Sequence, residues 1–314
     1  ILATVRMWKR IGYKPPRNIL LAFFADEEAS GTYGSRWLVK NRPELFAGCS
    51  EAVSEVGGFS VTITGGHRLY LVEAAQKGIA WIKLSAKGTA GHGSFINRDN
   101  AVTKVSDAVS RIGNYQWPQL LTKTTSQFFK KIAELTGDKF DPKNVQPLLH
   151  HLGNAVKMLG ATISNTANPT MLEAGYKANV IPQNASAVID GRFLPGYEND
   201  LHETIKKLAG DEIEVEILTR DIALEAEFAG PLVEAMCKAI NVEDSAGIPV
   251  PYLMSGGTDN KALHDLGIVG YGFSPLRLPE DLDFFALFHG VDERVPIDGL
   301  KFGVRVLYEF LENI

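Results

Sequence analysis

Hydrophobic positions at the start of the chain form two different patterns. Residues 1–11 carry apolar side chains at helical spacing, and residues 18–25 (NILLAFFA) form a continuous apolar run after the Pro15-Pro16 pair. Helical spacing predicts an amphipathic helix, whereas a short apolar run between turn residues is typical of a strand buried on both faces of a parallel sheet. A second strand is predicted within residues 51–58 (EAVSEVGG).

The middle of the chain has another pattern, in which long amphipathic strands and helices follow one another from about Leu69. Their order is strand, helix, strand, helix, strand, in residues 78–88, 101–112, 186–196, 199–210 and 212–221. This order resembles a split β-α-β unit, which predicts an antiparallel sheet covered by helices. Residues 117–159 add polar and helical segments between its halves.

An α/β pattern returns near Phe228, with a helix, a strand at 268–275 and a long terminal helix. We therefore predict an α/β fold whose main domain has a mostly parallel sheet flanked by helices and is discontinuous, comprising residues 1–75 and 224–314. Residues 76–223 are predicted to form an inserted α+β, ferredoxin-like lid or dimerisation domain.

Composition narrows the functional classes. The 314 residues are 45% hydrophobic, enough for a large core, and the net charge of −5 lacks the basic character that nucleic-acid binding requires. Cys49 and Cys237 stand outside any metal-ligand spacing, which favours a reduced, cytoplasmic protein. No apolar run approaches the roughly 20 residues of a membrane span, so we expect no membrane partner.

Carboxylates follow both strands predicted near the amino terminus. Asp26, Glu27 and Glu28 end the first apolar run, and Glu55 ends the second. Ligands of open α/β sheets bind outside the carboxyl ends of strands, and adjacent carboxylates repel unless a cation or a shared proton offsets their charge. The three adjacent acids alone are more often an acidic first helical turn. With Glu55 and His289, however, they supply oxygen and imidazole ligands suited to zinc.

Further polar residues lie in glycine-containing turns. They are His92 in GTAGHGS, Asn179 in KANVIPQ, Arg192 in DGRFLPG, and Ser255, Gly257 and Thr258 in SGGTDN. Glycines beside His92 allow its imidazole to approach another surface closely. The guanidinium of Arg192 suits a carboxylate, although an ion pair with Asp190 explains it equally well. The SGGTDN turn suits an anion or a plain helix cap.

Taken in order, ADEE, SEVGG, GTAGHGS, KANVIPQ, DGRFLPG, SGGTDN and HGVDERV resemble a family of zinc hydrolases. The family includes carboxypeptidase G, aminoacylase, acetylornithine deacetylase, succinyl-diaminopimelate desuccinylase and bacterial dipeptidases. The motifs span nearly the whole chain. The resemblance implies two zinc ions, with cobalt or manganese as alternatives, and a homodimer joined through the inserted domain.

The same resemblance implies a role for each candidate residue. Glu27 is the general base, Glu28 and Glu55 each bind one of the two zinc ions, and His289 completes the site of the metal on Glu28. His92, commonly supplied by the partner subunit's lid, stabilises the oxyanion. The substrate, chiefly its carboxylate end, is held by Asn179, Arg192, Ser255, Gly257 and Thr258.

The resemblance leaves three functions open. They are hydrolysis of an amide bond in a dipeptide or small peptide by a water that two zinc ions activate, deacylation of N-acetyl or N-succinyl amino acids, and non-catalytic peptide binding or dimerisation. None of the seven histidines begins the His-x-Asp motif of the family, and its bridging Asp is also not found here. We therefore expect an N-terminally truncated chain that is inactive or nearly so by itself.

Overall fold

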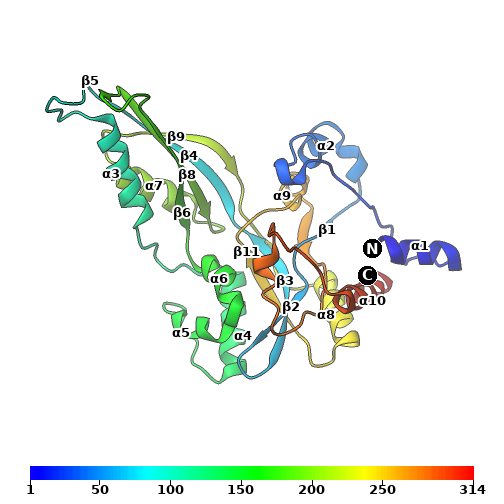
Figure 1. Cartoon of the computed structure of the whole chain (residues 1–314). Helices are drawn as coiled ribbons and strands as arrows, with labels where there is room; N and C mark the ends of the chain where they lie inside the picture. Colours follow the sequence, from blue (N-terminus) through cyan, green and yellow to red (C-terminus); the bar gives the residue numbers. More distant parts are fainter. The chain divides into compact units, whose positions relative to one another are not determined.

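The computed structural model describes residues 1–314, which divide into two compact units (Figure 1). Unit 1 comprises residues 1–76, 121–160 and 224–314, and unit 2 comprises residues 77–120 and 161–223. Both units combine helices with sheets, which confirms the predicted α/β class with an α+β insertion. No helix has the length and apolar character that a membrane span needs.

Unit 1 is built on a six-stranded mixed sheet around one long buried strand. Its strands are β1 (Glu51–Ser54), β2 (Phe59–Ile63), β3 (His67–Gln76), β10 (Leu224–Glu225), β11 (Ile248–Met254) and β12 (Val269–Gly272). The pairs β1–β12 and β11–β3 are parallel, while β2, β10 and β12 run antiparallel to β3. Residues 69–76 of β3 are all buried, and among them only Glu73 and Gln76 have strongly polar side chains.

Helices supply the rest of the unit 1 core. They are α1 (Leu2–Ile11), α2 (Ser35–Asn41), α4 (Lys123–Thr136), α5 (Gln146–Leu149), α6 (Val156–Leu159), α8 (Pro231–Glu243), α9 (Asn260–His264) and α10 (Ile297–Glu312). One apolar cluster joins Trp8 of α1 with Tyr70 of β3, Met236 of α8 and Phe302 of α10. Strands and helices from distant parts of the sequence therefore share one core.

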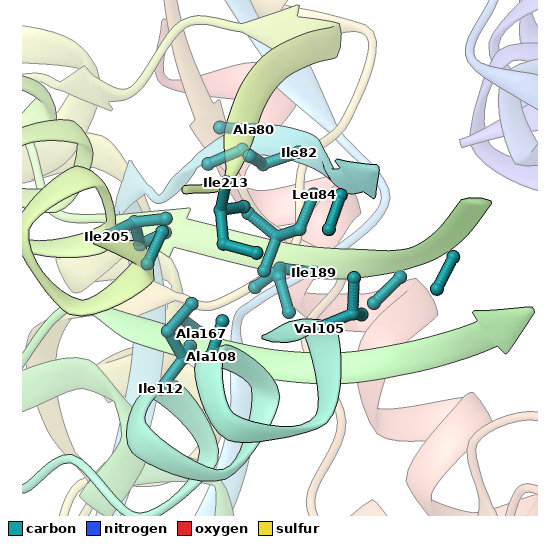
Figure 2. Close-up of a cluster of buried hydrophobic side chains, with 14 of the residues drawn as sticks. Ala80, Ile82, Leu84, Val105, Ala108, Ile112, Ala167, Ile189, Ile205 and Ile213 are labelled. Atoms are coloured by element: carbon teal, nitrogen blue, oxygen red, sulfur yellow. The ribbon is translucent and has the colours of Figure 1, made fainter. Parts of the chain in front are cut away.

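Unit 2 contains a four-stranded antiparallel sheet in the order β6-β8-β4-β9. Its elements are β4 (Gly78–Lys87), α3 (Ala101–Gly113), β6 (Thr166–Ala174), β8 (Asn184–Phe193), α7 (Glu198–Ala209) and β9 (Glu214–Asp221), with a separate pair of β5 (Gly91–His92) and β7 (Val180–Ile181). Alternate residues of β4 are buried, which is the pattern of a sheet with one covered face. Figure 2 shows Ile82 and Leu84 in the core that Val105 and Ile112 of α3 help to form.

Residues 18–25 are not the buried strand that we predicted. They form no strand, and the side chains of Leu20 and Phe23 are 51% and 74% exposed. A buried strand needs backbone partners for its N–H and C=O groups, and no strand of the described chain pairs with this run. The apolar sequence alone was therefore insufficient to predict a strand.

Residues 121–160 belong to unit 1, whereas the sequence placed them inside the insertion. Helix α4 packs against β11, and the backbone N–H of Thr124 donates to Glu225 Oε1 at 2.8 Å. Its apolar face, which includes Phe128 and Phe129, is buried. These contacts join the helical segment to the unit 1 sheet. The catalytic and lid roles of the two units stay predictions.

Candidate active site

The acidic segment after residue 25 forms a tight loop with an unusual backbone. Glu27–Ala29 make one 3-10 turn between Asp26, with φ 51°, and Ser30, with φ 75°. Asp26 Oδ2 accepts a hydrogen bond from the Tyr33 N–H at 2.9 Å, which holds the loop closed. Only three non-glycine residues of the chain have positive φ, and the third is His289. Such strain gathers at functional sites.

His289 and Glu28 lie close together although 261 residues separate them along the chain. His289 follows the 3-10 turn Phe285–Leu287, and its Nε2 is 4.0 Å from Glu28 Oε2. Both side chains are exposed. A carboxylate and an imidazole at this distance present the two ligand types that were predicted for one metal.

Electrostatic coupling joins these residues to two further carboxylates. The pKa of Glu27 is raised to about 7, chiefly by burial and also by the negative charges of Glu55, Asp259 and Glu28, while His289 acts to lower it. Burial, followed by Asp259 and Glu28, also raises the pKa of Glu55. We call Glu27, Glu28, Glu55, Asp259 and His289 the acid cluster. Its mutual repulsion is what a bound cation would offset.

Asp259 is the member of the acid cluster to which the sequence assigned no functional role. It lies in the SGGTDN turn, where we considered only anion binding or a helix cap. Burial raises the pKa of its carboxyl group. A Cβ at Gly31 would lie 3.2 Å from Asp259 Oδ1, so the acid loop and this turn are in close approach. That approach depends on tertiary packing, and the sequence offered no signal for it.

A buried hydrogen-bond network holds the SGGTDN turn against strand β3. Gln76 Nε2 donates to Thr258 Oγ1 at 2.8 Å and to Glu73 Oε2 at 3.2 Å, and the Thr258 N–H donates to Gln76 Oε1 at 3.0 Å. Burial raises the pKa of Glu73 to about 8. Asn260 Nδ2 reaches Ser54 Oγ at 3.0 Å, beside Glu55. The network therefore positions both the turn and the end of β1.

The predicted substrate residues of this turn differ in accessibility. Thr258 is buried and its hydroxyl is engaged within the network, whereas Ser255 and Gly257 are partly accessible. A Cβ at Gly257 would lie 2.7 Å from Cε of the Lys261 side chain, which therefore packs closely against this turn. Thr258 thus has a structural partner already, and its proposed substrate contact has no support from the geometry.

Unit 2 carries the remaining predicted residues in two places. His92 on β5 is exposed, with Nδ1 2.8 Å from Ser94 Oγ, and the Asn179 carbonyl accepts from the Gly93 N–H at 2.9 Å. His92 and Asn179 therefore lie close together. Arg192 on β8 forms a bidentate pair with Asp190 at 2.7 and 3.0 Å. The ion-pair explanation of Arg192 is thus realised.

The acid cluster fits a divalent ion by the chemistry of its donors. Glu28, Glu55 and His289 provide carboxylate oxygens and an imidazole nitrogen, which zinc accepts. Their ligand atoms do not form a compact group of three, however. The group whose ligand atoms all lie within 4.8 Å of one another is Asp138, His150 and His151 of unit 1, which we call the histidine cluster.

Comparison with known proteins gives a consistent picture. A family model described as "Peptidase dimerisation domain" matches residues 74–215. The probable carboxypeptidase S-like 2 of Dictyostelium discoideum is 27% identical, and the match covers 100% of this chain and 62% of the relative. The N-fatty-acyl-amino acid synthase/hydrolase PM20D1 of Mus musculus is 25% identical, and the match covers 96% and 62% of the two chains.

The solved structures support the fold. Human carnosine dipeptidase 1 superposes with a TM-score of 0.66 at 12% identity, covering 99% of this chain and 69% of that one. The chain spans less than two thirds of the length of the two curated relatives. Residues 74–215 thus match a peptidase dimerisation domain, and over nearly its whole length the chain is similar to M20 peptidases and aminoacylases, in agreement with its motifs.

Proposed function

We propose that the natural protein containing residues 1–314 hydrolyses an amide bond in a dipeptide or another small peptide. The observation that carries this proposal is the acid cluster, in which Glu27, Glu28 and His289 come together from distant parts of the sequence. Amide hydrolysis needs a base for the attacking water and positive charge at the carbonyl. The cluster offers residues for both tasks.

In this proposal Glu27 carries the proton. Its carboxylate accepts a proton from the attacking water and then delivers it to the leaving amine nitrogen. Glu28, Glu55 and His289 would hold zinc, as part of a centre for two zinc ions, with cobalt or manganese as alternatives. Bound metal supplies polarisation of the scissile carbonyl and eases ionisation of the water. Glu27 remains available for proton transfer because its neighbour Glu28 takes the ligand role.

The residues of unit 2 are proposed to bind substrate. His92 is exposed and flanked by glycines, which suits an imidazole that donates to an oxyanion. Asp190 occupies Nε and Nη2 of Arg192, which leaves Nη1 donors for a substrate carboxylate. Asn179 is a further proposed contact in unit 2, and Ser255 and Gly257 are proposed contacts in unit 1. The main role of Thr258 is to fix the turn.

A second substrate class is an N-acyl amino acid. Its support is the sequence likeness to an N-fatty-acyl-amino acid synthase/hydrolase over 96% of this chain. Peptides and N-acyl amino acids both place an amide beside a carboxylate, so one site can serve both and the pocket shape decides between them. Assays of one protein against both substrate sets will separate the two classes.

The decisive test compares wild type with Glu27→Gln in the natural protein after zinc or cobalt is restored. The two proteins are offered dipeptides and N-acyl amino acids, and released amine is measured. Hydrolysis that depends on both metal and Glu27 supports the proposal. Peptide binding by wild type without any hydrolysis supports instead the non-catalytic, dimerising alternative.

We also propose a homodimer formed through unit 2, because the dimerisation-domain match covers most of that unit. Sedimentation of the natural protein as a monomer at micromolar concentration would contradict this. Cys49 and Cys237 are both free thiols, which supports a reducing, cytoplasmic location. Cell fractionation tests that location.

A further inference from the structure

The histidine cluster is a second group of potential metal ligands, outside the acid cluster and unused by the proposed hydrolysis. Asp138 follows the left-handed cap Gly137 at the end of α4, and His150 and His151 begin the 3-10 segment after α5. One ligand atom from each of the three residues lies within 4.8 Å of the other two. The imidazole centroids are 3.8 Å apart.

The cluster has one buried side and one open side. His151 is 8% exposed, and its Nδ1 is buried without a hydrogen-bond partner, while its Nε2 lies 2.5 Å from Asp138 Oδ2. The nitrogen that faces Asp138 is Nε2, so Nε2 is the atom of His151 that can share an ion with this carboxylate. Asp138 and His150 are exposed and leave the cluster accessible from solvent.

Local hydrogen bonds fix the cluster in place. The His151 carbonyl accepts from the Thr64 N–H at 3.0 Å, which ties this residue to the end of β2. Thr136 Oγ1 donates to Asp138 Oδ2 at 3.3 Å, which ties Asp138 to the last turn of α4. Two ligand-bearing segments are therefore held side by side before any ion binds. Such preorganisation lowers the ordering cost of binding.

We propose that Asp138, His150 and His151 bind one divalent transition-metal ion, with zinc as the reference ion. Two imidazoles and a carboxylate match the ligand preferences of zinc, and water completes a site that has three protein ligands. The ion links the end of α4 to the segment after α5 and closes the loop between them. Its role is structural, because it restrains residues 138–151 against the unit 1 sheet.

The competing explanation is that Asp138 and His151 form only an ion pair, with His150 packed beside it. Zinc titration distinguishes the two. Residues 1–314 carrying Glu28→Gln, Glu55→Gln and His289→Ala are stripped with chelator, dialysed and titrated calorimetrically with zinc chloride. Those three substitutions remove all of the proposed acid-cluster ligands, so the zinc that remains reports on the histidine cluster. No activity measurement is needed, so the outcome is independent of the proposed hydrolysis.

We expect this background protein to bind one zinc equivalent at the cluster. Adding His150→Ala or Asp138→Asn should weaken that binding by at least about tenfold, the scale on which even outer-shell partners affect metal affinity. Both side chains are exposed, so the fold should survive, and circular dichroism checks this. His264→Ala, an exposed histidine outside the cluster, should leave zinc binding unchanged.

Two titration results would overturn the proposal. One is that the background protein binds no zinc. The other is that His150→Ala and Asp138→Asn bind zinc as tightly as the background, which leaves an ion pair only. Crystals of the background protein soaked in zinc give a second measurement. An anomalous peak between the three side chains supports the site, and the lack of a peak there contradicts it.

Discussion

The acid cluster and the histidine cluster are both groups of potential metal ligands, but they differ in charge and in how the fold brings their residues together. The acid cluster draws its members from loops that are far apart in the sequence. Burial, with the negative charges of the neighbouring carboxylates, raises the pKa of Glu27 to about 7. The histidine cluster comes from two short-range segments, with one carboxylate against two imidazoles. The acid cluster has mutually repelling carboxylates from distant segments, which suits proton transfer. The histidine cluster is local and has a single carboxylate, which suits a bound structural ion.

Backbone strain separates the two clusters as well. The acid loop adopts positive φ at Asp26 and Ser30, whereas positive φ near the histidine cluster occurs only at Gly137 and Gly153. Glycine takes this conformation without the steric cost that other residues incur. Strain at non-glycine residues is therefore confined to the loops that carry the proposed catalytic groups.

The largest expected effect is on the rate of amide hydrolysis, which should depend on the acid cluster and not on the histidine cluster. In the natural protein, Glu27→Gln should lower the rate of amide hydrolysis by about 10²- to 10⁴-fold, because the amide side chain cannot carry the proton. Asp138→Asn should leave the rate near that of wild type. Steady-state hydrolysis with zinc present measures both. Equal losses of hydrolysis rate in the two variants would contradict the claim that only the acid cluster is catalytic.

The buried acid behind the acid cluster should make stability depend on pH. The pKa of Glu73 is raised from 4.5 to about 8, so the folded protein keeps a proton that the unfolded chain loses above pH 4.5. The free energy of unfolding should therefore fall as pH rises from about 4.5 to 8, by on the order of 5 kcal/mol at most.

Glu73→Gln should flatten this slope, because the amide does not titrate. Urea unfolding at several pH values measures the effect, and Glu134→Gln on the exposed side of α4 is the matched control. A slope that persists in Glu73→Gln would assign the pH dependence to other groups.

Removing a hydrogen bond near each cluster should lower the free energy of unfolding by unequal amounts. Thr258→Val removes the hydroxyl partner of the buried Gln76 Nε2 and should lower the free energy of unfolding by about 1–3 kcal/mol. Thr136→Val near the histidine cluster removes a half-buried hydroxyl that donates to the Ile132 carbonyl at 3.0 Å and to exposed Asp138 at 3.3 Å. No buried polar side chain loses its partner, so the loss of stability should be smaller. Comparable losses in chemical denaturation would show that burial does not distinguish the two networks.

The smallest effect concerns the strained backbone. Ser30→Gly should raise the free energy of unfolding by less than about 1 kcal/mol, because relief of positive φ is partly offset by greater unfolded-chain entropy. The same change at Ser110, inside α3, should lower it by a similar amount. Thermal unfolding compares the pair, and destabilisation by both would argue against strain at Ser30.

Local patterns were sufficient for most elements of the fold. The period of apolar residues predicted β4, α3, β8, α7 and β9 in their correct order, because their faces are set within each segment. Residues 18–25 failed because strand formation depends on partner strands elsewhere. Strand β11 was not predicted, since Pro249 and Pro251 argue against a strand. Their spacing places both missing N–H groups on one edge, which leaves the other edge free to pair with β3.

The candidate site was predictable only in part. The sequence pattern proposed Glu27, Glu28, Glu55 and His289 as a group, although the strand expected before Glu27 is absent, and their roles stay predictions. Asp259 was missed because its approach to Gly31 arises from packing between distant segments. The histidine cluster was missed because the pair in LLHHLG looks like part of a helix and carries no sign of Asp138.

The most direct test of the central claim is metal-restored hydrolysis by the natural protein that contains residues 1–314. After removal of metal with chelator, release of amine from dipeptides and N-acyl amino acids is measured before and after zinc is added. The acid cluster predicts that hydrolysis is absent without metal, returns with zinc and stays absent in Glu27→Gln. Hydrolysis of neither substrate set by zinc-loaded wild type, or equal hydrolysis by Glu27→Gln, would contradict it.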